Sequence, residues 1–196
     1  MTAKACLVAL ALLLVGATTA SAAIRGIQIL TGLTTQTGTL TFRANAMTSV
    51  CNVTITKQMV QNLVPVMPGV LTRIGQVTSW IVNNPLDCAL RILNLPTTLG
   101  GFPPPSGPLP GSWDISYLTS DPLTNDLYFG ILGVQLSPFV GTACLYQGTL
   151  LGAIRNNGAL LTFNSTLPSL AGNCVDVTVS GTLFDNPAIQ YVLLNI

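Results

Sequence analysis

Residues 37–46 read TGTLTFRANA, and this stretch decides the fold class. The apolar residues Leu40, Phe42 and Ala44 alternate in it with polar residues, chiefly threonine. Successive side chains of a β-strand point to opposite faces of the sheet, so this alternation predicts a strand with one buried face. Threonine and other β-branched residues are enriched in strands, which favours the same interpretation. We therefore expect a β-protein around this segment.

Strand signals of the same kind continue on both sides of this segment. They are runs of β-branched or alternating residues bounded by Gly, Asn and Pro. The further strands expected are residues 24–30, 50–56, 113–117, 127–136, 143–151, 159–165, 174–183 and 189–196. About nine to eleven short strands separated by turn signals are typical of a sandwich or a barrel. We expect an all-β, single-domain β-sandwich of Ig-like or jelly-roll type.

Residues 57–82 carry two conflicting patterns. Apolar residues from Val70 to Ile81 follow the spacing of a helix face. Gly75 and the heavy β-branching of the segment favour strands instead. We favour strands, either as a pair or as one irregular strand.

Residues 102–111 read FPPPSGPLPG and form the clearest break in the chain. Such a density of proline forces an extended, unpaired segment. A PxxP ligand for an SH3 domain is the functional interpretation, but SH3 partners belong mostly to the cytosol. We expect a stiff crossover loop.

Residues 1–22 have the layout of a secretory signal peptide. Lys4 gives a positive start, residues 7–15 are an unbroken apolar run, and a small-residue ASA site precedes Ala23. The apolar run is shorter than the roughly 20 residues that a membrane-spanning helix needs. We expect no transmembrane span in the mature chain, and one exported domain over residues 23–196 that is secreted or held at the cell surface.

Charged residues are scarce in this chain. They make up 7% of it, against about 25% in an average protein. The chain has no His and no Glu, and its formal net charge is +1. Because a nearly neutral surface has no field to attract nucleic acid or an anionic membrane, we expect neither as a partner.

Four cysteines remain after removal of the predicted signal peptide: Cys51, Cys88, Cys144 and Cys174. An even number in an exported chain indicates two disulfides, and four cysteines allow three pairings. We favour Cys51–Cys88 and Cys144–Cys174, because each pair links neighbouring predicted strands within one half of the chain. A zinc or redox site is disfavoured, because the chain has no CxxC spacing and no His.

Ionisable groups for catalysis are few. Without His and Glu, a Ser-His-Asp or Cys-His arrangement cannot form, and no motif surrounds Lys57, the single lysine after the predicted signal peptide. Asp114, Asp121 and Asp126 could supply a carboxylate pair for hydrolysis. Residues 121–126 (DPLTND) could hold calcium, but they lack the DxDxDG spacing. Asp in such contexts usually serves turns, so we expect no catalytic residue, no metal and no cofactor.

Aromatic residues provide the best candidates for a binding surface. Trp80, Trp113, Tyr117 and Tyr128, with Tyr146, could line a site for a carbohydrate or a hydrocarbon. Their positions within alternating strands favour core packing for most of them. The first four are kept as candidate ligand-binding residues.

Several short motifs occur in an order that resembles a known group. They are VCNVTI at 50–55, Cys88, WDI at 113–115, CLYQG at 144–148, and Cys174 before SGTL at 180–183. The chain resembles small secreted proteins, mainly of actinobacteria, and is more distantly similar to the PraB-type alkane oxidation activator proteins of pseudomonads. The resemblance implies an extracellular, disulfide-linked β-protein and supplies no catalytic residue.

These observations together predict a non-enzymatic cell-envelope or extracellular protein. It would act by self-association or by surface binding, because edge strands with few charges are open to strand addition. The last strand, residues 189–196, is the candidate donor. The alternative is a module that binds a small apolar ligand, a hydrocarbon or a glycan, and a hydrolase that uses the Asp residues is a third possibility.

Overall fold

The computed structural model of the chain describes residues 25–45, 47–67, 69–84, 87–88, 90–93, 113–121, 123–138, 144–155, 158–171 and 174–195. These residues form β-strands joined by turns, and no helix occurs among them. The strands are β1 (Arg25–Ile29), β2 (Leu33–Ala44), β3 (Met47–Met59), β4 (Val64–Val66), β5 (Thr72–Val82), β6 (Leu90–Leu93), β7 (Trp113–Ser120), β8 (Leu127–Pro138), β9 (Leu145–Ile154), β10 (Leu160–Leu167), β11 (Ser169–Ala171), β12 (Val177–Asn186) and β13 (Tyr191–Asn195).

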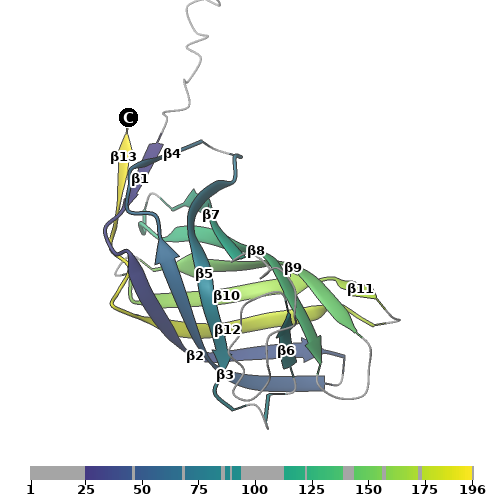
Figure 1. The fold of residues 1–196 in the computed structure, drawn as a ribbon. Helices are drawn as coiled ribbons and strands as arrows, with labels where there is room; N and C mark the ends of the chain where they lie inside the picture. Colours follow the sequence, from purple (N-terminus) through teal and green to yellow (C-terminus); the bar gives the residue numbers. More distant parts are fainter. Residues whose placement is uncertain are drawn as a thin grey trace, which may run out of the picture.

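The main sheet closes on itself. Its hydrogen-bonded order runs β9–β10–β12–β2–β3–β5–β7–β8, and β8 pairs again with β9. All these pairings are antiparallel, so the eight strands form a closed barrel (Figure 1). The short strand β6 pairs with the C-terminal end of β8, and the short strand β11 pairs with the N-terminal end of β9.

This closure corrects the expected Ig-like or jelly-roll sandwich, while the all-β class is confirmed. Strands of a sandwich and of a barrel both bury one face and alternate in the same way. The difference lies in one pairing, from Leu127↔Ile154 to Leu136↔Tyr146, which joins β8 to β9. Alternation within a strand carries no information on which strand lies beside it.

The barrel interior is filled by the apolar faces that alternation predicts. In β2, Leu40 and Phe42 are buried, whereas the adjacent Thr39 and Thr41 are not. Trp80 of β5 and Trp113 of β7 meet edge to face, with their ring centroids 5.6 Å apart. An eight-stranded barrel is just wide enough for side chains to fill its interior, and this one follows that rule.

Two glycines let β2 and β12 approach each other closely. A Cβ atom added to Gly38 would lie 2.4 Å from the carbonyl oxygen of Thr182, and one on Gly181 would lie 2.2 Å from that of Thr39. No real side chain tolerates such contacts, so both positions require glycine at this separation.

A second, three-stranded sheet has the order β13–β1–β4 and lies at one end of the barrel (Figure 1). Its buried residues include Ile27, Ile29 and Val66, and Ile189 next to β13 is buried as well. They extend the core of the barrel to this end. The strands expected at residues 24–30 and 189–196 correspond to β1 and β13.

The strand interpretation of residues 57–82 is confirmed, since this stretch contains the end of β3 and all of β4 and β5. Both expected disulfides are also confirmed. Cys51 pairs with Cys88 and Cys144 with Cys174. The predicted signal peptide and residues 102–111 lie outside the described residues. Among those described, the structure has no helix of the length and apolar character needed to cross a membrane.

Candidate functional site

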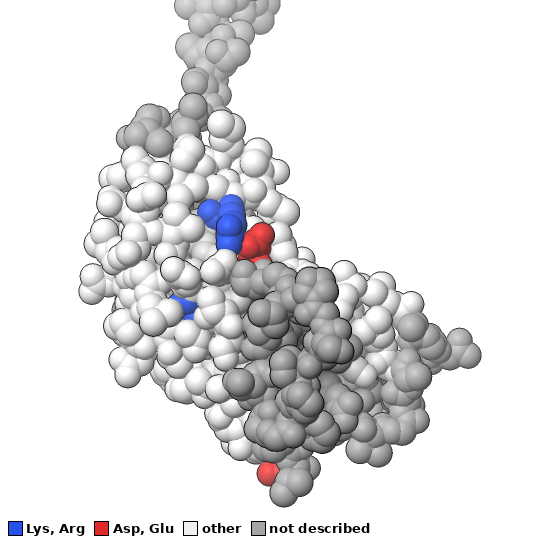
Figure 2. Space-filling view, viewed as in Figure 1, with Lys and Arg blue, Asp and Glu red and all other residues white. Residues whose placement is uncertain are grey.

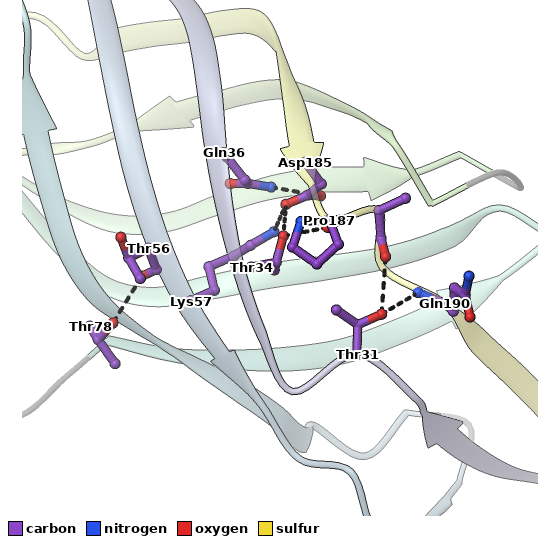
Figure 3. Close-up of polar contacts among 10 residues, drawn as sticks. Thr31, Thr34, Gln36, Thr56, Lys57, Thr78, Asp185, Pro187 and Gln190 are labelled. Atoms are coloured by element: carbon purple, nitrogen blue, oxygen red, sulfur yellow. Dashed lines mark hydrogen bonds and ion pairs between the residues drawn. The ribbon is translucent and has the colours of Figure 1, made fainter.

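A lysine and an aspartate meet inside the barrel. Lys57 points inward from β3 and Asp185 points inward from β12, the two strands on either side of β2. Lys57 Nζ lies 2.9 Å from Asp185 Oδ1, and the two side chains are 2% and 0% exposed (Figure 3). This ion pair is therefore shielded from solvent on all sides.

The strand pattern itself turns both residues inward. In β3, Cys51, Val53 and Ile55 are buried at every second position, and Lys57 is next in that series. In β12, Asp185 follows buried Leu183 in the same way. A charged residue that continues an apolar face is held inside by the register of its strand.

Two polar side chains of β2 complete the site. Thr34 Oγ1 donates a hydrogen bond to Asp185 Oδ1 at 3.0 Å, and Gln36 Nε2 donates one to Oδ2 at 3.3 Å (Figure 3). Thr34 Oγ1 also lies 2.7 Å from the carbonyl oxygen of Pro187. Gln36 is fully buried, and its Oε1 atom has no hydrogen-bond partner. The site thus holds one unused buried acceptor.

Burial sets the electrostatics of this pair. Desolvation lowers the pKa of Lys57 to about 8, although attraction to Asp185 works against this shift. Desolvation also raises the pKa of Asp185, against the opposing effects of Lys57, Gln36 and Thr34. Both shifts favour the neutral forms, because a low-dielectric interior penalises charge.

The aspartates considered for hydrolysis or calcium do not converge. Asp114 forms an ion pair with Arg73 at 2.8 Å on the surface. Asp126 pairs with Arg155 at 2.5 Å. Among the described residues, no group of three potential metal ligands comes together.

Asp121 has a structural contact that accounts for its position. Its Oδ1 accepts the backbone N–H of Leu123 at 2.8 Å, and this hydrogen bond lowers the pKa of Asp121. It is the turn role that its sequence context indicates. The expected absence of a catalytic aspartate stays a prediction.

The aromatic candidates do not share one exposed surface. Trp80, Trp113 and Tyr117 are buried in the core, as is Tyr146, whereas Tyr128 is 36% exposed. Core packing accounts for the buried side chains. Ligand binding by any of them stays a prediction.

Large apolar side chains gather instead around the end of the barrel that carries β1, β4 and β13. They come from the β1–β2, β3–β4 and β4–β5 connections and from Leu33, the first residue of β2. Gln61 Nε2 links two of these connections by donating a hydrogen bond to the carbonyl oxygen of Leu30 at 3.1 Å. The six exposed residues are Leu30, Leu33, Leu63, Met67, Val70 and Leu71, called the apolar rim below. Charges are isolated spots on the face of the molecule shown in Figure 2.

Sequence reasoning missed the Lys57–Asp185 site. A usable signal was present, because both residues continue an apolar face at the period of two. Alternation could not show that Lys57 and Asp185 meet, because they belong to strands that are far apart in the chain. The apolar rim could not be predicted from alternation, because five of its six residues lie in connections between strands.

Comparisons with protein-family models, with curated proteins and with solved structures found no match to this chain. The resemblance to small secreted actinobacterial proteins and to PraB-type proteins therefore stays a prediction.

Proposed function

We propose that this is a non-enzymatic extracellular or cell-envelope protein that acts by contact, through self-association at the apolar rim. The two disulfides support an oxidising compartment for this role, because such bonds persist mainly outside the cytosol. The scarcity of charge supports association as well, since nearly neutral proteins repel one another weakly.

The apolar rim is the observation that carries the proposal. Leu33 is 63% exposed and Leu71 is 58% exposed, although large apolar side chains gain free energy when they leave water. Exposed apolar groups that gather in one region mark contact surfaces, whereas scattered ones need no explanation. A second copy of the chain presents the same surface, so the rim can pair with itself.

Barrel closure changes where strand addition could occur. The eight central strands have partners on both sides, which removes the edges that a sandwich would expose. β13, within the predicted donor segment 189–196, pairs with β1 in the same chain and stands at the edge of the three-stranded sheet. β13 lies at the same end of the barrel as the apolar rim, so contact between two rims and pairing of β13 with a second copy of the chain would use one interface.

The two other functions have less support. Binding of a hydrocarbon or glycan by Trp80, Trp113 and Tyr117 would require buried core residues to reach a ligand. An Asp-dependent hydrolase would require carboxylates that converge, but Asp114 and Asp126 pair with different arginines. Neither function is carried by a specific observation.

Sedimentation velocity over a concentration series tests the proposal. We expect the purified protein to self-associate reversibly, and Leu33→Lys and Leu71→Lys to weaken association about tenfold or more, since desolvating a charge there is costly. Leu123→Lys is the matched control, because Leu123 is 91% exposed in the turn between β7 and β8. A protein that stays monomeric throughout, or equal weakening by Leu123→Lys, would overturn the proposal.

A further inference from the structure

We propose that Lys57 and Asp185 become joined by an intramolecular amide bond between Lys57 Nζ and Asp185 Cγ. Such a bond would link β3 to β12 covalently across β2. It is a modification of the chain by itself and is independent of self-association at the rim.

The barrel holds the two reacting groups in contact. Lys57 Nζ lies 2.9 Å from Asp185 Oδ1, and Cγ is the next atom. β3 and β12 are both fixed to β2 by long runs of register, so neither group can leave without opening the barrel. Groups held in such contact react as if at very high local concentration, because their translational and rotational entropy has already been lost.

The reaction balances without any co-reactant. A proton passes from the Lys57 ammonium to Asp185 Oδ1, which leaves a neutral amine beside a neutral acid. The lone pair of Nζ then forms a bond to Cγ, and the electrons of the C=O bond move to Oδ2. When the carbonyl re-forms, the bond from Cγ to Oδ1 breaks, and Oδ1 leaves as water with one further proton from Nζ. The products are one amide and one water molecule.

The surrounding polar groups suit this step. Gln36 Nε2 donates to Oδ2, the oxygen on which negative charge develops, and so stabilises the intermediate. Thr34 Oγ1 donates to Oδ1, the oxygen that leaves. Gln36 Oε1 is a buried acceptor without a partner before the reaction. An amide N–H or the released water would supply the donor that it lacks.

Burial favours the product over the ion pair. A buried ion pair loses hydration that its mutual attraction often fails to repay, whereas an amide carries no net charge. The lowered pKa of Lys57 and the raised pKa of Asp185 support the first proton transfer, because both shifts favour neutral forms. Solvent is excluded from both side chains, which also protects the amide from hydrolysis.

Intact-mass spectrometry of the exported, reduced protein tests the proposal directly. The N-terminus is first identified by sequencing, so that the expected mass of the processed chain is known. We expect the wild-type protein to be lighter than this mass by one water molecule. Tandem spectra of a digest should show one branched peptide pair that contains Lys57 and Asp185, with no tryptic cleavage after Lys57.

Variants separate the bond from a purely structural ion pair. The Asp185→Asn variant should be lighter than its own sequence mass by one ammonia molecule, because attack of Lys57 Nζ on the side-chain amide expels ammonia. Lys57→Met and Asp185→Ala should have the full sequence mass. Lys57→Met fills the site with an uncharged chain of similar length, and a free-thiol assay checks that the disulfides have formed. A wild-type protein whose disulfides are shown to have formed, and which has the full sequence mass after they are reduced, would overturn the proposal.

Discussion

Lys57 illustrates what a single residue can decide in this chain. Its neighbours at every second position are apolar, so the pleat of β3 directs the Lys57 side chain into the barrel although its charge loses hydration there. Asp185 continues the inner face of β12 and offsets part of that cost by pairing with Lys57. The inward direction of each residue could be predicted from alternation. Their meeting could not, because it depends on β12 and β3 both pairing with β2.

Gly181 supports a prediction at the same scale. A Cβ atom there would lie 2.2 Å from the carbonyl oxygen of Thr39, so Gly181→Ala must push β2 and β12 apart. We expect the free energy of unfolding to fall by about 1 to 3 kcal/mol, the usual cost of overpacking. Urea denaturation followed by circular dichroism measures it.

The control for that substitution is Ser180→Ala on the neighbouring, exposed position of β12. It should change the free energy of unfolding by no more than about 0.5 kcal/mol, as is usual for surface sites. Equal stability of the two variants would show that β2 and β12 lie further apart than described.

The half-buried side chain of Tyr191 links β13 to the barrel. Tyr191 Oη donates a hydrogen bond to the carbonyl oxygen of Asn125, in the turn before β8. Burial, with a smaller contribution from Asp126, raises the pKa of Tyr191 to about 12. A phenol whose pKa is higher in the folded state stabilises that state while it is protonated. This contribution is complete below the ordinary pKa of 10 and is lost as pH rises from 10 to about 12.

Tyr191→Phe tests this contact between β13 and the barrel. At neutral pH we expect it to reduce the free energy of unfolding by about 1 kcal/mol, the usual net value of a hydrogen bond. The wild type should lose stability between pH 10 and 12, and the variant should lose less. Urea unfolding at several alkaline pH values measures the difference. Parallel pH profiles for the two proteins would contradict the contact.

For the strands, alternation in the sequence predicts which side chains face the core. Leu40 and Phe42 face the core as their pattern indicates, and Gly75 and its β-branched neighbours do form strand rather than helix. Alternation gives the faces of a strand but not its neighbours. The β8–β9 pairing was therefore missed, and with it the closed barrel.

At the scale of the whole molecule, the described residues form a barrel with two disulfides, in a chain that has few charged residues. Cys51–Cys88 and Cys144–Cys174 are separated by 37 and 30 residues, so each restrains one half of the chain. Their pairing was predictable because it is local. The site inside the barrel and the apolar rim were not, because both arise only once distant segments have assembled.

The second disulfide supports a prediction for the whole fold. Replacing Cys144 and Cys174 together with serine should lower the free energy of unfolding by about 3 to 4 kcal/mol, from the entropy that a loop of this length regains in the unfolded chain. Guanidinium denaturation of the two proteins gives the value. A double variant as stable as the wild type would show that this bond does not restrain the unfolded state.

The central claim is that the molecule acts by contact through one end of the barrel. Hydrogen–deuterium exchange, compared between dilute and concentrated wild-type protein, tests it most directly. We expect slower exchange at high concentration in residues 30–33, 60–71 and 191–195, with the rest of the barrel unchanged. Identical exchange at both concentrations, or new protection confined to the opposite end of the barrel, would contradict the claim.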